Sequence, residues 1–349
     1  MPSIREHIVW CVCCLAIVGI YSVYIRPLIP DFYEGKPVPF GEWIEYVYPR
    51  FVIEKQRFPL DFFISKADQL IFRLIVVSYA GLCLFNILRT PKFRKWLFIK
   101  TSRKQVRLLQ FVFYVLVAFF TYDWLSTLND YQKLKVFYSP VSWIAWLGLP
   151  YFSPFWLLVT WLSYMISLIL ASFNLKGIWS ASIAGILFVI LQGYLQSFGK
   201  INHEYAPLTY LMLLMPFLIY ETQKAKDTFE SWSLQLMRIA AISGYVLSGI
   251  EKLLISNGMV WKDEPFCGLV HDKLPKFTSL FPIDGHVWAA IVVIFQISFV
   301  LVPFSSKSQK ILLPLGVLFH ISIWNFFGIG AIFHPWLVGY IFYSIQDRS

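Results

Sequence analysis

Long apolar runs recur along the whole chain, from Ile8 to Tyr343, and restrict what it can fold into more than any motif does. Only 14% of the 349 residues are charged, 58% are hydrophobic, and the mean hydropathy is +0.62. This composition predicts an all-α polytopic membrane protein rather than a soluble domain. The net charge of +10 does not indicate nucleic-acid binding, because lysine and arginine gather in short loops where they set membrane orientation.

Apolar windows of membrane-crossing length predict a bundle of about ten transmembrane helices. They lie near residues 8–25, 68–88, 107–126, 152–172, 178–197, 207–221, 234–256, 286–304, 310–327 and 330–345. The loop from Arg89 to Arg107 carries eight basic residues and no acidic one, so the positive-inside rule places it in the cytoplasm, with both chain termini. We expect an N-terminal helix with an external amphipathic loop over 1–67 and one membrane module over 68–345.

Two charged residues, Glu251 and Lys252, interrupt the apolar stretch 239–256. A charge inside a membrane-length segment is expensive and marks a functional site by default. Lys252 lies about one turn from the external end of its helix, so a lysine that snorkels to the headgroups is the alternative. Gly244 and Ser248 precede it at four-residue spacing, and their small size would let a neighbouring helix or a ligand approach the ammonium.

Glu251 points about 100° away from Lys252 around the helix, so it does not share that face. We expect it to pair with a charge on another helix, for which Arg73 is the candidate. Burial favours the neutral, basic form of a lysine, whereas a nearby carboxylate favours the ammonium. The sequence leaves open which effect prevails.

Histidines supply the other candidate site residues. His203 lies in an external turn at about the depth of Lys252, where a solvated loop histidine is the alternative. His320 lies within a predicted span, where an ionisable side chain faces the bundle interior or a cavity. His334 and His271 are loop histidines with weaker claims. No metal is expected, because neither the histidines nor the five cysteines show ligand spacing.

The sequence lacks a glycine-rich phosphate loop, a G-x-S-x-G elbow and an H-E-x-x-H motif, so hydrolases and nucleotide-binding proteins lose support. What remains is a base, one or two histidines and an aromatic-rich membrane pocket. Such a pocket suits a lipophilic ring compound.

Four segments resemble a known family. The segment YVLSGIEKLLISNGMVW, which includes Tyr245, Lys252 and Trp261, resembles the Y-x-x-x-G-x-x-K-L then W-x-x-G signature of vitamin K-dependent gamma-glutamyl carboxylases and the HTTM (horizontally transferred transmembrane) family. The segments FRLIVVSYAGL, INHEYAPLTYL and FHISIWNFFGIGAIF resemble three further pieces of that family, in the same order. The four segments span residues 72–333, which is most of the chain.

The resemblance implies a membrane enzyme. In the carboxylases, a lysine at the position of Lys252 deprotonates reduced vitamin K, and the reaction with oxygen yields a strong base that removes a proton from a substrate glutamate, which then captures carbon dioxide. The histidine matched by His203 helps to position that chemistry. Glu251 departs from the family, which commonly has a second lysine there, and residues 262–264 replace the glycine that follows the tryptophan.

Three functional hypotheses follow. The first is a quinone-dependent, carboxylase-like enzyme with Lys252 and His203 as catalytic residues and Glu251, Arg73, His320, Tyr245 and Trp261 in support. Its expected cofactor is a reduced quinone, with oxygen and carbon dioxide as co-substrates, and its partners are membrane lipid and an exported peptide or protein. The second is a non-catalytic maturation or immunity partner of an exported peptide, and the third is a proton-coupled transporter. A bacterial inner membrane is the expected location.

Overall fold

The computed structural model describes residues 3–48, 51–198, 203–255, 285–327 and 334–345. The chain forms two compact units. The N-terminal unit comprises Met1–Leu97, Leu134–Tyr151 and Gln196–Gly199, and the bundle unit comprises Phe98–Lys133, Phe152–Leu195 and Lys200–Ser349. The predicted boundary between residues 67 and 68 falls inside a helix that belongs to the N-terminal unit, so that boundary stays a prediction.

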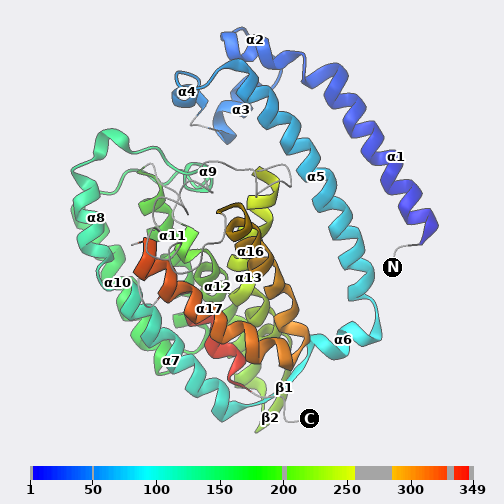
Figure 1. Ribbon diagram of the computed structural model, residues 1–349. Helices are drawn as coiled ribbons and strands as arrows, with labels where there is room; N and C mark the ends of the chain where they lie inside the picture. The colour runs from blue at the N-terminus through cyan, green and yellow to red at the C-terminus, as the bar shows by residue number, and fades with distance from the viewer. Residues whose placement is uncertain (1–2, 49–50, 199–202, 256–284, 328–333, 346–349) are drawn as a thin grey trace. The chain divides into compact units, whose positions relative to one another are not determined.

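The N-terminal unit is built on a hairpin of two long apolar helices, α1 and α5 (Figure 1). Its elements are α1 (Ile4–Ile20), η1 (Tyr21–Ile25), α2 (Leu28–Glu34), α3 (Gly41–Val47), α4 (Phe51–Glu54), α5 (Leu60–Leu88), α6 (Pro91–Leu97), η2 (Lys135–Phe137) and α9 (Ser142–Trp146). Asp68 on α5 binds the segment that follows α1, because it accepts a hydrogen bond from Tyr21 of η1 at 2.7 Å and pairs with Arg26 at 3.0 Å.

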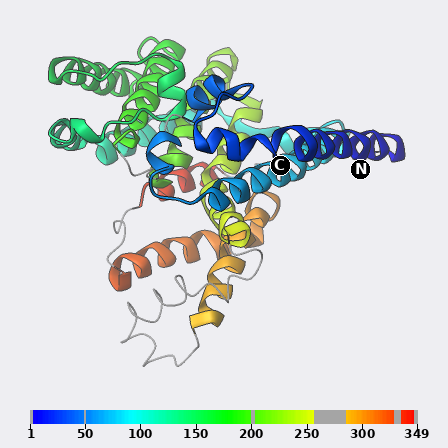
Figure 2. The ribbon, with the colours of Figure 1, turned by 90° about the horizontal axis from the view of Figure 1, so that it is seen from above.

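The bundle unit contains the remaining helices and one β-ribbon (Figures 1 and 2). Its elements are β1 (Ile99–Ser102), α7 (Arg103–Thr121), α8 (Trp124–Gln132), α10 (Pro154–Ser172), α11 (Ile178–Gln196), η3 (His203–Tyr205), α12 (Ala206–Lys224), β2 (Thr228–Ser231), α13 (Trp232–Ile255), α16 (Gly285–Ser298), η5 (Phe299–Phe304), α17 (Ser306–Phe327) and η6 (Pro335–Tyr343). Helix α13 is central, because it packs against α12, α16, η5 and η6.

Small residues allow this close packing. A Cβ added to Gly339 on η6 would lie 2.8 Å from the Cα of Ala241 on α13, and one added to Gly185 on α11 would lie 2.9 Å from the carbonyl oxygen of Met212 on α12. Membrane helices use such positions to bring backbones together, since lipid gives them no hydrophobic drive to associate.

The ribbon pairs the basic segment before α7 with the loop between α12 and α13. Strand β1 runs antiparallel to β2, with Ile99 opposite Ser231 and Ser102 opposite Thr228. These two loops therefore lie at the same end of the bundle unit. The all-α prediction did not include this ribbon.

Seven helices in the described part of the chain are long and apolar enough to cross a membrane, which confirms a helical membrane protein. They are Ile4–Ile25, Leu60–Leu88, Arg103–Gln132, Pro154–Ser172, Ile178–Gln196, Trp232–Leu253 and Val287–Phe304. Each coincides with a predicted span. The spans predicted at 207–221, 310–327 and 330–345 are not among these seven, so the count of ten and the cytoplasmic placement of both termini stay predictions.

Candidate functional site

The ammonium of Lys252 is held by side chains of the bundle unit. Its Nζ donates to Ser248 Oγ at 2.8 Å and to Gln296 Oε1 on α16 at 3.1 Å. Ser248 lies one turn earlier on α13, so the lysine side chain runs back toward the middle of the helix. A lysine that snorkelled would extend toward the helix end and the headgroups. These contacts favour a held ammonium over a snorkelling one.

Gly249 explains how Gln296 comes within reach of Lys252. A Cβ added to Gly249 would lie 2.8 Å from Cγ1 of Ile297 and 3.1 Å from Cβ of Gln296. Any side chain at position 249 would therefore push α16 away from α13. The glycine lets the two helices approach and so lets the buried Gln296 amide accept from Lys252.

Gly244 has a different role from the one expected. A Cβ at Gly244 would lie 2.9 Å from Pro207 on α12 and 2.9 Å from the Trp336 ring on η6. The small residue admits two neighbouring elements of the bundle, whereas Ser248 is the residue of this face that reaches the ammonium.

An aromatic cluster begins two helical turns from Lys252 on the same face of α13, on the order of 10 Å away along the axis. At its centre the fully buried Tyr245 ring stacks on Phe299, with ring centroids 4.0 Å apart and planes 5° from parallel. The Tyr340 hydroxyl donates to the Tyr245 hydroxyl at 2.7 Å. The other rings around Tyr245 are Phe295, Phe319, His320 and Trp336.

Two buried histidines stack within this cluster. The rings of His320 on α17 and His334 at the start of η6 lie 4.2 Å apart and 15° from parallel. His334 Nδ1 accepts from the backbone N–H of Trp336 at 3.3 Å, whereas His320 Nε2 is buried with no hydrogen-bond partner among the described residues. His320 is buried in the bundle, and His334, which lies in the loop directly before η6, is buried against it.

The structure describes the other predicted site residues only in part. The side chain of Glu251 is exposed and lies off the face that Lys252 shares with Ser248. Arg73 is an exposed residue of α5 in the N-terminal unit, so its pairing with Glu251 stays a prediction. His203 begins η3, which packs against η6, but its side chain lies outside what the structure describes. Trp261 and His271 lie in 256–284, also outside the described residues.

Sequence reasoning missed another cation on α13, the buried Arg238. Arg238 Nε donates to the carbonyl oxygen of Phe342 at 3.0 Å, and its Nη2 donates to the carbonyl oxygen of Ile345. The Tyr343 hydroxyl donates back to the Arg238 carbonyl at 2.7 Å. Arg238 thus binds the carbonyl groups at the end of η6 and fixes that element to α13.

These features define a class of protein: a polytopic α-helical membrane protein whose bundle unit holds an ammonium and two stacked histidines beside aromatic rings. No protein-family model, curated protein or solved structure matches the chain. The resemblance to the HTTM family therefore stays a prediction, and the site must be interpreted from its own chemistry.

Proposed function

We propose that the chain is an integral membrane enzyme that uses Lys252 as a general base toward a reduced quinone and drives modification of an exported peptide, as in the carboxylases it resembles. The observation that carries the proposal is the position of Lys252 Nζ, held by Ser248 and Gln296 on the face of α13 that carries the aromatic cluster about two turns away. A general base must lie within hydrogen-bond reach of its proton, in a setting that orients it. Uncharged oxygens of Ser248 and Gln296 orient this amine.

The aromatic cluster suits a flat lipophilic ligand. When bound, a reduced quinone supplies an aromatic diol whose reaction with oxygen provides the driving force for modifying a peptide. Its ring has two flat faces and two hydroxyl groups. The cluster is rich in aromatic rings, and His320 Nε2 is a buried polar atom without a hydrogen-bond partner among the described residues, so it is available to a ligand hydroxyl.

Lys252 and the two histidines would have different roles toward the ligand. Lys252 Nζ would accept a proton from one phenolic hydroxyl, since a lysine base abstracts a proton through its free electron pair. Ser248 and Gln296 would then receive the hydrogen bonds of the resulting ammonium. His320 and His334 would orient the ligand from the other end of the cluster, which makes them positioning residues.

The test is quinone-dependent oxygen uptake by the full chain in liposomes, with reduced naphthoquinone as the probe. Lys252→Met should lower the rate about 10²–10⁴-fold, the usual contribution of a general base. Lys252→Arg keeps the charge and the donors but cannot give up its proton, so it should be as inactive. In Lys252→Ala, added methylamine should restore part of the rate.

The matched control is Lys310→Met, which removes an exposed lysine from α17 and should keep full activity. A thermal unfolding curve for each variant separates lost chemistry from lost folding. The proposal fails if the folded wild-type chain shows no quinone-dependent oxygen uptake, or if Lys252→Met or Lys252→Arg retains it.

A further inference from the structure

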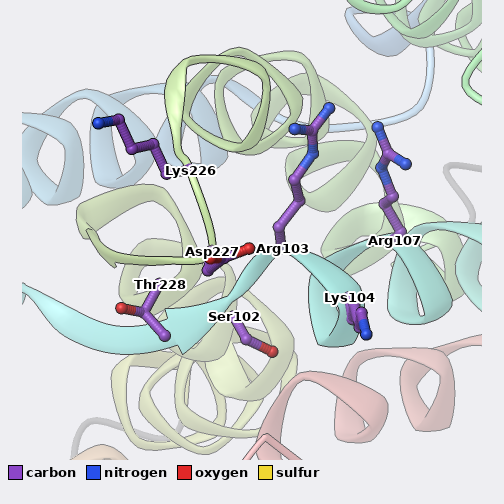
Figure 3. A pocket seen from close by; sticks show the side chains of 7 residues that line it. All are labelled: Ser102, Arg103, Lys104, Arg107, Lys226, Asp227 and Thr228. Atoms are coloured by element: carbon purple, nitrogen blue, oxygen red, sulfur yellow. The ribbon is translucent and has the colours of Figure 1, made fainter.

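A basic cavity lies at the opposite end of α13 from Lys252, beside the ribbon. Its volume is about 500 Å³, and its lining includes Ser102, Arg103, Lys104, Arg107, Lys226 and Asp227 (Figure 3). Strand β2 ends directly before α13 begins, 20 residues ahead of Lys252, so roughly 30 Å of helix separates this cavity from the lysine. The proposed enzyme chemistry makes no use of it.

The cavity concentrates positive charge. Four of its lining residues are basic and one is acidic. Arg103 and Arg107 are four residues apart on α7, hence on one face, and their guanidinium groups extend to the same side in Figure 3. Like charges at this spacing destabilise a helix. Within the described residues, neither arginine forms an ion pair.

Arg103 also has a donor without an acceptor. Its Nε is buried and has no hydrogen-bond partner among the described residues, although its backbone N–H donates to the Asp227 carbonyl at 2.9 Å. A buried donor left unpaired destabilises the folded state. Two guanidinium forks on one face match the oxygen geometry of a phosphate group, which would satisfy that donor and neutralise the repulsion.

Apolar surface begins directly beside the arginines. Leu108 is 66% exposed and Phe111 is 38% exposed, and both follow Arg107 on the same apolar helix, which is long enough to cross a membrane. A phosphate at this level would therefore have room for acyl chains alongside. We infer that this cavity binds the phosphate group of a ligand at the membrane surface, and that an anionic phospholipid headgroup is the ligand that its surroundings favour.

The experiment places the full chain in phosphatidylcholine nanodiscs and measures the binding of phosphatidic acid by comparing nanodiscs with and without that lipid. A separate measurement uses glycerol 3-phosphate as a soluble probe. The test variant is Arg103→Gln with Arg107→Gln. The matched control is Lys92→Gln with Lys95→Gln, which removes equal charge from exposed positions of the same basic segment outside the cavity. The arginine variant should weaken phosphatidic acid binding about tenfold or more, whereas the control should bind like wild type.

Three further outcomes decide the inference. If Arg103→Lys with Arg107→Lys also binds weakly, the fork geometry of the guanidinium is required, as expected for a phosphate site. If glycerol 3-phosphate competes with the lipid, the phosphate site stands and soluble phosphorylated molecules also use it. If the glutamine variant of Arg103 and Arg107 and the glutamine variant of Lys92 and Lys95 lose binding equally, the positive charge acts only as a diffuse attraction to the membrane. The inference is then wrong.

Discussion

Gln296→Leu tests whether the hydrogen bond between Lys252 and Gln296 contributes to the free energy of unfolding. The substitution removes the Oε1 acceptor that lies 3.1 Å from Lys252 Nζ and keeps a similar side-chain volume, so the cavity contribution should be small. A hydrogen bond to a charged group contributes about 1.5–3 kcal/mol. Because Ser248 still accepts from the ammonium at 2.8 Å, we expect the loss to fall near the lower end, about 1.5 kcal/mol.

A double-mutant cycle isolates that contact. In Lys252→Met, the buried Gln296 amide loses its charged donor, so Gln296→Leu in that background should be neutral or stabilising. The free energy of unfolding of all four proteins, measured by denaturant titration in mixed micelles, should give a coupling of about 1.5 kcal/mol or more.

Gln309→Leu is the control for this cycle. Its side chain donates to the Val302 carbonyl at 3.1 Å and belongs to a different contact, so it should show no coupling to Lys252→Met. Additive effects of Gln296→Leu and Lys252→Met, within error, would refute the reasoning, because they would show that the two side chains do not stabilise each other.

Two further predictions concern the frame around the site. Arg238→Met should lower the free energy of unfolding by about 3 kcal/mol, because two charge-assisted hydrogen bonds to the carbonyls of Phe342 and Ile345 are lost, and proteolysis at the end of η6 should become faster. Gly316→Ala should displace the Tyr340 hydroxyl, which a Cβ at that position would overlap, and destabilise the protein by about 1–3 kcal/mol in thermal unfolding. In Tyr340→Phe, which lacks that hydroxyl, the same glycine change should cost clearly less.

Much of the fold could be predicted because a membrane helix is recognisable from its local sequence. A long apolar window must be helical in lipid, since every backbone group has to be satisfied within the segment. The helices at 154–172 and 178–196 differ from their predicted bounds by at most two residues. The ribbon was missed because its strands are four residues long and lie in polar loops, where neither periodicity nor length signals a strand.

The site could be predicted only where a charge stood out against an apolar background. Lys252 did, whereas Gln296 is a lone amide in an apolar window whose partner lies 44 residues away. His334 resembled a loop histidine because its burial depends on η6 packing against α13 and stacking the ring on His320. Contacts of this kind follow from tertiary packing, which no local pattern encodes.

Arg238 and Lys252 lie on the same helix but have different kinds of hydrogen-bond partner, and the proposed role of Lys252 as a base depends on that difference. Arg238 donates to two backbone carbonyls, which cannot turn away without unwinding η6, and arginine stays charged in any protein setting. Lys252 Nζ makes a long contact of 3.5 Å to the Ser248 carbonyl, but its two shorter hydrogen bonds to described residues go to side-chain oxygens that can rotate as the charge on the amine changes. A base needs that freedom, because it must exist in both protonation states. Lys252→Arg is therefore the sharpest variant, since it preserves everything that a structural cation contributes and removes what a base requires.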